Sequence, residues 1–146
     1  NIEIAKEISL TLDNTAPITS INIGTPKYQS NDVVHATSTT QFTLGVIDAL
    51  SGVASTEYRI DDADWKPYAP FIVEGEGTHV IMYRSIDNMG NVEVGKTLTV
   101  TIDNTAPTTG ISIGIPKYEN GGNLYIKSNT LVTLTSSDML SGVAST

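Results

Sequence analysis

An internal repeat of 90 residues constrains this chain more than any other feature of its sequence. Residues 1–56 align without a gap on residues 91–146 and give 28 identities in 56 positions. The run Leu50–Thr56, which reads LSGVAST, returns letter for letter as Leu140–Thr146. Self-similarity at a fixed period is typical of proteins built by stacking one structural unit many times. We therefore expect a tandem array whose unit has 90 residues.

The register of the repeat divides the chain into three parts. Residues 1–13 correspond to residues 91–103, so we expect them to be the closing strand of a preceding repeat. Residues 15–103 make one complete repeat, and residues 106–146 make the opening part of the next. Because both ends fall inside a repeat, we expect the chain to be an excerpt from a longer polypeptide.

The opening part of the second repeat lacks much of what a core needs. It has no counterparts of the large apolar residues in the second half of the complete repeat, namely Tyr58, Trp65, Phe71, Val80, Met82 and Tyr83. A domain the size of the complete repeat can bury a core of its own, whereas a much shorter segment cannot. We expect residues 106–146 to depend on something else, either the rest of a longer chain or neighbouring copies.

Composition excludes several classes of function. The chain carries 16 acidic residues against 8 lysines and arginines, which gives a net charge of −8. Nucleic acids and anionic membrane surfaces attract clustered Lys and Arg, so neither is an expected partner. The absence of cysteine excludes a disulfide framework and thiol chemistry. No apolar run approaches the roughly 20 residues of a membrane-spanning helix, so we expect no membrane insertion.

The spacing of apolar residues predicts an all-β fold. Apolar side chains alternate with others along residues 42–46 and along residues 98–102, which is the period of a strand. The strands predicted in the complete repeat are Thr19–Gly24, Gln41–Asp48, Ser55–Ile60, Trp65–Tyr68, Phe71–Val73, Thr78–Ile86 and Val92–Ile102. Seven short strands in a unit of this size are typical of an Ig-like or fibronectin-III-like Greek-key β-sandwich, here without a disulfide.

Turn and edge residues separate the predicted strands. Asp61–Asp64 and Glu74–Gly77 read as turns, and Gly121–Asn123 reads as a turn in the second repeat. Pro67 and Pro70 suit the edge of a sheet, because proline has no N–H to donate to a neighbouring strand.

Spaced motifs in the complete repeat carry a resemblance to a known family. They are Asp48–Val53 (DALSGV), Glu57–Asp61 (EYRID), Trp65–Tyr68 (WKPY), Pro70-Phe71, Gly77–His79 (GTH), Tyr83–Asp87 (YRSID), Gly90–Glu93 (GNVE) and Asp103–Pro107 (DNTAP). With them the chain resembles a family of prokaryotic extracellular Ig-like tandem repeats, which includes bacterial Ig-like domains and leptospiral outer-membrane-type repeats. The resemblance implies an extracellular or cell-surface location in a large protein, such as an adhesin or an accessory part of a carbohydrate-active enzyme. It implies no single biochemical activity.

Nothing in the sequence is typical of a catalytic site. The two histidines are His35, which is replaced by Tyr125 in the second repeat, and His79, which lies inside a predicted strand. No nucleophile–base pair, phosphate-binding loop or zinc-ligand spacing is present. We therefore predict a non-enzymatic structural module, the body of a stalk, fibre or filament that spaces an adhesive region. Its expected partners are neighbouring Ig-like repeats of the same or identical chains.

A group of carboxylates and amides suggests a calcium site between consecutive repeats. In an Ig-like sandwich, the lead-in to the first strand and two of the loops meet at one end, and oxygen ligands suit Ca²⁺. The candidate ligands are Asp13, Asn14, Asp48, Asp87, Asn88, Asn91, Asp103, Asn104 and Asp138. The competing interpretation is that Asp48, Asp87 and Asp103 cap their own turns by hydrogen bonds to the backbone. The sequence leaves both interpretations open.

The linker before the complete repeat is short and stiff. It reads Thr15-Ala16-Pro17, and the proline fixes its own φ and restricts Ala16 to extended conformations. Successive repeats joined in this way should form a rod rather than a flexible string.

Two alternatives to a purely structural role remain. Exposed aromatic rings can stack on sugars, so Trp65 and Tyr68 are candidates for the binding site of a carbohydrate-binding accessory module; the ligand would be a polysaccharide or a host or cell-surface molecule. Large aromatic residues are also what the core of a small domain needs, and burial of Trp65 would favour the structural interpretation. The second alternative is an intramolecular isopeptide bond, for which Lys96 and Asn88 are the nearest candidates.

Overall fold

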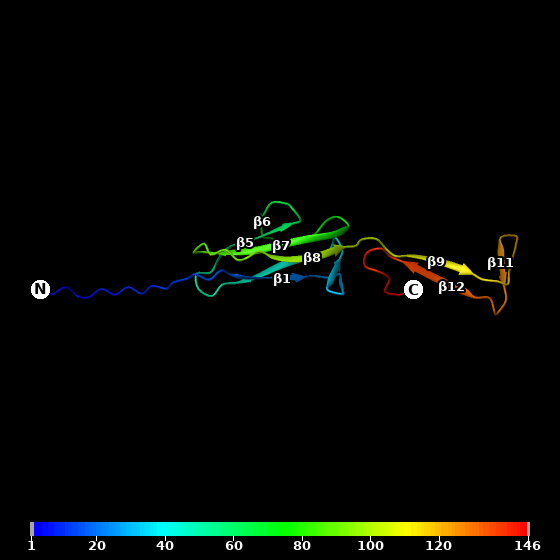
Figure 1. The fold of residues 1–146 in the computed structure, drawn as a ribbon, viewed down its shortest axis with the longest axis horizontal. Coiled ribbons are helices and arrows are strands. Elements are labelled where there is room, and N and C mark those ends of the chain that lie inside the picture. Colours follow the sequence, from blue (N-terminus) through cyan, green and yellow to red (C-terminus); the bar gives the residue numbers. More distant parts are fainter. Residues whose placement is uncertain (1, 146) are drawn as a thin grey trace.

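The computed structural model of this chain describes residues 2–145, and those residues form strands and no helix, as the all-β prediction requires (Figure 1). The complete repeat contains β1 (Ile18–Ile23), β2 (Lys27–Ser30), β3 (Val33–Ala36), β4 (Phe42–Ile47), β5 (Val53–Ile60), β6 (Lys66–Pro67), β7 (Gly77–Asp87) and β8 (Lys96–Ile102). The following part contains β9 (Thr108–Ile113), β10 (Lys117–Asn120), β11 (Asn123–Ile126) and β12 (Val132–Ser137). Within the described range, no helix is long and apolar enough to cross a membrane. Asn1 and Thr146, the outer limits of the predicted segments 1–13 and 106–146, lie outside the described residues.

The strands of the complete repeat form two sheets. Six of them lie in the order β2-β3-β8-β7-β5-β6, while β1 pairs with β4 in a sheet of its own. Each strand pairing is antiparallel except that of β3 with β8, which is parallel. The strand β6 has two residues and lies at one end of the six-stranded order, so Pro67 is at a sheet edge as predicted.

The hydrophobic core draws on both sheets. Its buried members include Phe42 from β4, Ile81 from β7 and Val100 from β8, all with no exposed surface. Phe71 packs between two other rings, with its centroid 5.6 Å from that of Phe42 and 3.9 Å from that of Tyr58. Full burial of such side chains contributes about 1.5–3 kcal/mol each, so this cluster is the main source of stability for the complete repeat.

Strands β2 and β3 are additional to the predicted set. Each has four residues, and they are joined by a two-residue turn at Asn31 and Asp32, whose φ angles are +48° and +64°. A two-residue turn with two positive φ angles suits a tight β-hairpin, and Asn and Asp tolerate it better than most residues. Gly121 and Gly122 take the same position between β10 and β11, which confirms that turn.

Two predicted strands are wrong in their extent. Phe71–Val73 does not form a strand: Phe71 makes an isolated bridge to Phe42, in which the two residues exchange backbone hydrogen bonds of 2.7 and 3.1 Å, and the pairing does not continue to Val73. The strand predicted from Val92 begins only at Lys96, and Val92 itself makes one isolated bridge to Ile86.

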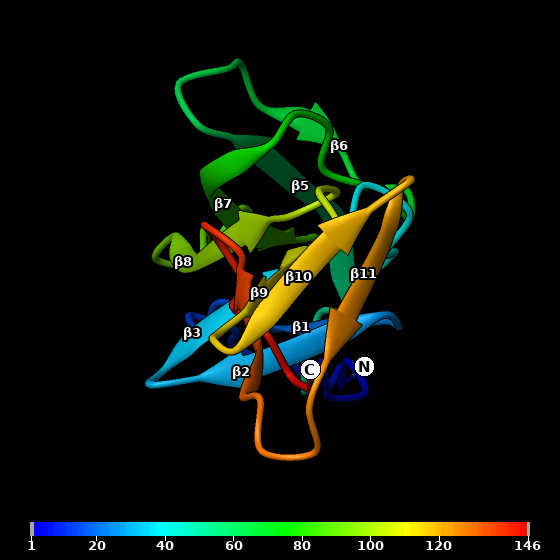
Figure 2. The same ribbon diagram turned by 90° about the vertical axis from the view of Figure 1, so that its right-hand side faces the viewer.

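The four strands after the linker recur at the repeat offset but leave their apolar side chains exposed. Strands β9 to β12 have the bounds of β1 to β4 shifted by 90 residues. Val132 is 45% exposed where its counterpart Phe42 is fully buried, and Leu134 is 54% exposed where Leu44 is buried. Figure 1 shows this part placed beyond the end of the complete repeat, and in the end-on view of Figure 2 it lies in front of that repeat. In the described residues after the linker, no strand corresponds to β5–β8, which contribute core residues such as Ile81 and Val100 to the complete repeat.

The segment before the linker forms no strand in this chain. Residues 2–12 are exposed and extend away from the complete repeat along the long axis (Figure 1). That residues 1–13 close a preceding repeat therefore stays a prediction.

Candidate metal centre

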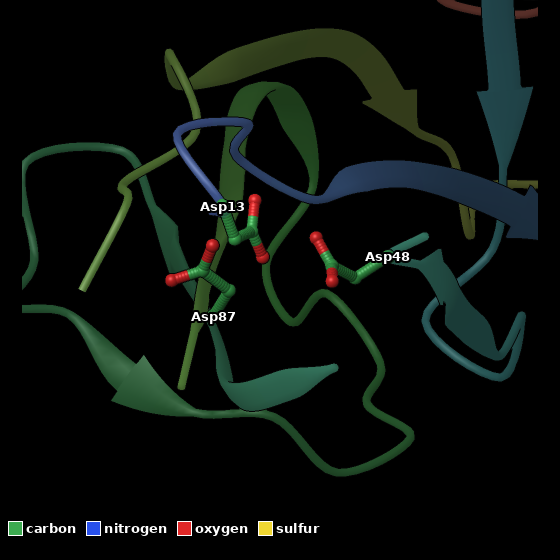
Figure 3. A group of neighbouring side chains, drawn as sticks. All are labelled: Asp13, Asp48 and Asp87. Carbon is green, nitrogen blue, oxygen red and sulfur yellow. The ribbon is translucent and has the colours of Figure 1, made fainter. Parts of the chain in front are cut away.

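Three aspartates from distant parts of the sequence meet at one end of the complete repeat. Asp13 lies just before the linker, Asp48 follows β4 and Asp87 ends β7. One carboxylate oxygen from each lies within 4.8 Å of the others, and Figure 3 shows the three side chains grouped at one place. Two oxygens that bind one Ca²⁺ ion at 2.3–2.6 Å lie at most about 5 Å apart. The group can therefore hold a metal ion such as Ca²⁺.

Each of these carboxylates also closes a turn in its own loop. The hydrogen bonds run from the N–H of Thr15 to Asp13 (3.0 Å), from that of Gly52 to Asp48 (2.8 Å), and from those of Met89 and Asn91 to Asp87 (2.9 and 2.8 Å). These bonds fix the position of each side chain, and they are the turn-capping role that the sequence left open. The three aspartates therefore cap their turns and also lie close to one another, because an oxygen that accepts an N–H does not prevent the carboxylate from facing the other two.

The carboxylates carry more negative charge than the surrounding side chains neutralise. Asp13 and Asp87 are 8% and 2% exposed, and no ion pair between described residues involves Asp13, Asp48 or Asp87. The Ser51 hydroxyl, close by though not aligned for a hydrogen bond, and the N–H groups of Thr15 and Ser51 lower the pKa of Asp13, against the effect of burial. Burial raises the pKa of Asp87, but the hydrogen bonds from Asn91 and Met89 outweigh it and leave a net lowering. Both groups are thus ionised at neutral pH, and a cation would relieve their repulsion.

The same end of the repeat is fastened to the segment before the linker. Asp13 accepts a 2.8 Å hydrogen bond from the N–H of Ser51, which lies in the loop after β4. The Asn91 amide donates to the backbone oxygen of Asp13 (3.3 Å) and to the Asp87 carboxylate (2.7 Å). Two loops of the complete repeat therefore hold Asp13 in place.

The predicted amide ligands have other contacts in this arrangement. Asn91 donates its amide nitrogen to the Asp87 carboxylate and to the backbone oxygen of Asp13, and Asn88 donates to the backbone oxygens of Ser51 and Gly52 at 2.8 and 3.1 Å. Asn14 is exposed. The aspartates converge, while Asn88 and Asn91 brace the loops that carry them.

The predicted ligands at the second linker repeat part of this geometry. Asp103 accepts the N–H of Ser141 at 2.8 Å and that of Thr105 at 3.0 Å, as Asp13 does from Ser51 and Thr15. Asp138 closes its own turn as Asp48 does, by accepting the N–H groups of Leu140 and Gly142. Asn104 lies elsewhere and accepts from Ser38. Within the described residues, the group of acidic side chains that could hold a metal ion is that of Asp13, Asp48 and Asp87.

A second buried polar cluster joins β1 to the start of β8. Glu93 is 8% exposed, and its carboxylate accepts the N–H of Thr19 (2.9 Å), the Thr19 hydroxyl (2.5 Å) and the Lys96 ammonium (2.9 Å). Lys96 also donates to the Thr19 backbone oxygen at 2.5 Å. Burial raises the pKa of Glu93, but the bonds from Thr19 and Lys96 outweigh it and leave the pKa below its ordinary value. The cluster is therefore an ion pair whose two members both form hydrogen bonds with Thr19 of β1.

Glu93 is not among the predicted site residues, although the sequence contains a signal for it. Within residues 91–100, only Asn91, Glu93 and Lys96 are identical to their counterparts in residues 1–10. Preservation of a Glu and a Lys three residues apart, in a segment where the apolar residues vary, indicates that the two are needed together. The two candidates for an isopeptide bond have different partners, since Lys96 contacts Glu93 and Thr19, whereas Asn88 donates to the backbone oxygens of Ser51 and Gly52.

The two aromatic residues proposed for sugar binding have different surroundings. Trp65 is half-buried and lies against two guanidinium groups, with that of Arg84 4.3 Å and that of Arg59 5.2 Å from its ring centroid. Tyr68 packs against the core, and its hydroxyl accepts the N–H of Leu44 at 2.8 Å. No ring–ring contact between Trp65 and Tyr68 occurs within the described part of the chain. They do not make a shared flat platform.

Known proteins supply no role for these residues. Comparison of the chain with protein-family models, with characterised proteins and with solved structures gives no match.

Proposed function

We propose that this chain is a structural module of a prokaryotic extracellular or cell-surface protein, in which Ig-like β-sandwich repeats follow one another as the body of a stalk, fibre or filament. One observation supports this above the others. The bond from Ser51 to Asp13 and the bond from Ser141 to Asp103 are both 2.8 Å long and lie 90 residues apart. Each fastens the residue before a linker to a loop of the unit that follows.

The linker after the complete repeat is also held from the preceding side. The side-chain oxygen of Asn104 accepts the N–H of Ser38 at 2.9 Å, and the Thr105 hydroxyl donates to Glu76 at 2.6 Å. With Asp103 bound to Ser141 on the far side, contacts on both sides limit the directions in which the second unit can point. A fixed angle at every linker makes a rod of the array.

Calcium binding at each junction would strengthen this arrangement. Asp13 comes from before the linker, whereas Asp48 and Asp87 belong to the unit after it, so one ion would bridge the two. Hard oxygen ligands favour Ca²⁺, and extracellular modules bind it with dissociation constants of about 10⁻⁴–10⁻³ M. The ion adds to the hydrogen bonds that already hold Asp13.

The experiment that tests the array measures how its length grows with the number of repeats. One, two, three and four copies of residues 15–104, joined end to end so that each junction reads Asp-Asn-Thr-Ala-Pro as in the native chain, would be compared by small-angle X-ray scattering with and without Ca²⁺. A rod predicts that the maximum dimension rises by the same increment for every added repeat. A flexible string predicts growth nearer to the square root of the number of repeats.

A matched variant separates the junction bonds from the repeats themselves. Replacing the aspartate at each junction (Asp103→Ala) should make the maximum dimension rise less than linearly with the number of repeats, as expected of a flexible string. Asp64→Ala, in an exposed turn, should leave the increase linear. Sublinear growth of the unaltered array in the presence of Ca²⁺ would refute the proposed rod.

A further inference from the structure

The two ends of the complete repeat lie at opposite ends of its long axis. β1 starts at Ile18, beside the aspartates of the candidate metal centre, and β8 ends at Ile102, where the chain continues towards the next unit (Figure 1). A pull on the chain from both sides therefore reaches the repeat through β1 and β8. These two strands are the first to carry the load.

Both strands are held by ladders that lie along the direction of pull. β1 is paired with β4 over six residues, and β8 lies between β3, its parallel partner, and β7. The ladder bonds run across the strands, so a pull along a strand loads all of them at once. A pull across the strands would break the same bonds one after another.

The Glu93 cluster joins the two loaded strands directly. Thr19 is the second residue of β1, at the end where tension enters, and its N–H, hydroxyl and carbonyl are all bound by Glu93 and Lys96. Lys96 is the first residue of β8. Hydrogen bonds to charged groups are stronger than neutral ones, and the burial of the Glu93 carboxylate shields its two bonds to Thr19 from water, whereas Lys96 is 40% exposed. Tension that would lift the start of β1 must first break this cluster.

We propose that the complete repeat is built to carry tension along its long axis, and that Thr19, Glu93 and Lys96 form a latch that resists the detachment of β1. Load-bearing is a property beyond that of a stiff spacer. The biological use of this property rests on the proposed array, but the property itself does not, because Thr19, Glu93 and Lys96 all lie within one repeat.

The test is single-molecule force spectroscopy on the full chain. The chain has no cysteine, so two engineered cysteines give unique attachment points. Thr15→Cys with Ala106→Cys places the pull along the axis, and Thr15→Cys with Leu50→Cys peels β1 from the end of β4. We expect the axial direction to require a several-fold higher unfolding force than the peeling direction.

Glu93→Gln tests the latch itself, and Glu57→Gln is its control. Glu57 pairs with Arg84 at 2.6 Å between β5 and β7, neither of which is attached to a handle. Under a constant axial force, Glu93→Gln should unfold roughly tenfold faster than the unaltered chain, because it replaces charged hydrogen bonds by neutral ones. Glu57→Gln should change the rate by less than about twofold.

Equal rates for the two variants, or equal unfolding forces in the two directions, would overturn the proposal. If Glu93→Gln does not fold, Lys96→Met and the comparison of directions in the unaltered chain decide the question. If the scattering experiment shows a rod but the repeats unfold at low force, the proposed function is retained and only this inference is refuted.

Discussion

Ser141 donates its backbone N–H to the carboxylate of Asp103 across a 2.8 Å hydrogen bond, so a loop of the second unit is fastened to the last residue before its linker. The distance and the two residue types are those of Ser51 and Asp13 at the first linker. The geometry of the junction is therefore a property of the repeat rather than of one site.

Loss of this carboxylate should loosen the junction. Asp103→Ala removes the acceptor for the N–H groups of Ser141 and Thr105 together. Spin labels at Thr97→Cys and Thr133→Cys, on exposed positions of the two units, would report the distance between them by pulsed electron paramagnetic resonance. We expect a distribution clearly broader than in the parent chain or in the Asp64→Ala control. An unchanged width would show that the linker is held without the bond.

Calcium should stabilise the complete repeat through the three aspartates. At a free concentration about 100 times the dissociation constant, binding to the folded state alone adds about 2.7 kcal/mol to the free energy of unfolding. For a domain of this size, that raises the melting temperature by roughly 10–20 °C. Differential scanning calorimetry in EDTA and in CaCl₂ measures the shift. Asp48→Asn should abolish it, whereas Asp62→Asn, in an exposed turn, should not.

Acid should destabilise the complete repeat in the absence of calcium. Hydrogen bonding holds the pKa of Asp13 and of Asp87 below the ordinary aspartate value of 3.8, despite the burial that raises both. The unfolded chain therefore takes up protons before the folded one does. The stabilisation is present in full above that ordinary value and is lost as the pH falls through the lowered ones. Urea unfolding between pH 7 and pH 2 should show the decline.

The variant Asp87→Asn tests the source of that decline. Its amide keeps an oxygen that can accept the N–H groups of Met89 and Asn91 but cannot titrate over this range. The unfolding free energy of the variant should fall less steeply with acid than that of the parent chain. Equal slopes would assign the acid sensitivity to other carboxylates, such as Glu93.

One core position allows a comparison between the two units. Phe42→Ala should lower the free energy of unfolding of the complete repeat by about 3–5 kcal/mol, because the ring is fully buried against Phe71. Val132→Ala, at the corresponding position after the linker, should change it by less than about 0.5 kcal/mol, since Val132 is 45% exposed. Chemical denaturation followed by the fluorescence of Trp65, the single tryptophan, reports on the complete repeat alone. A similar loss in both variants would mean that residues 106–145 share its core.

The sequence predicted the longer strands because their side chains alternate. The run from Phe42 to Ile47 and the run from Lys96 to Ile102 each place apolar residues on one face, and both are strands. The convergence of Asp13, Asp48 and Asp87 followed from the fold prediction, because the loops of such a fold meet at its ends.

Other features depend on contacts that no local pattern contains. Strands β2 and β3 have four residues each and show too little alternation to be recognised, although their turn at Asn31 and Asp32 is a good hairpin signal. Phe71 looked like part of a strand because it is apolar, yet it packs as a single ring between Phe42 and Tyr58. The burial of Glu93 depends on its encounter with Thr19, which lies 74 residues away in the sequence.

The two-residue strand β6 has a consequence for copies of the molecule that meet one another. It lies at one edge of the six-stranded sheet, where a longer strand would offer a row of free N–H and C=O groups to any passing chain. Lys66 adds charge there, and Pro67 has no N–H to offer. Neighbouring copies therefore find few backbone groups to pair with at this edge, and β6 should not serve as a template for aggregation.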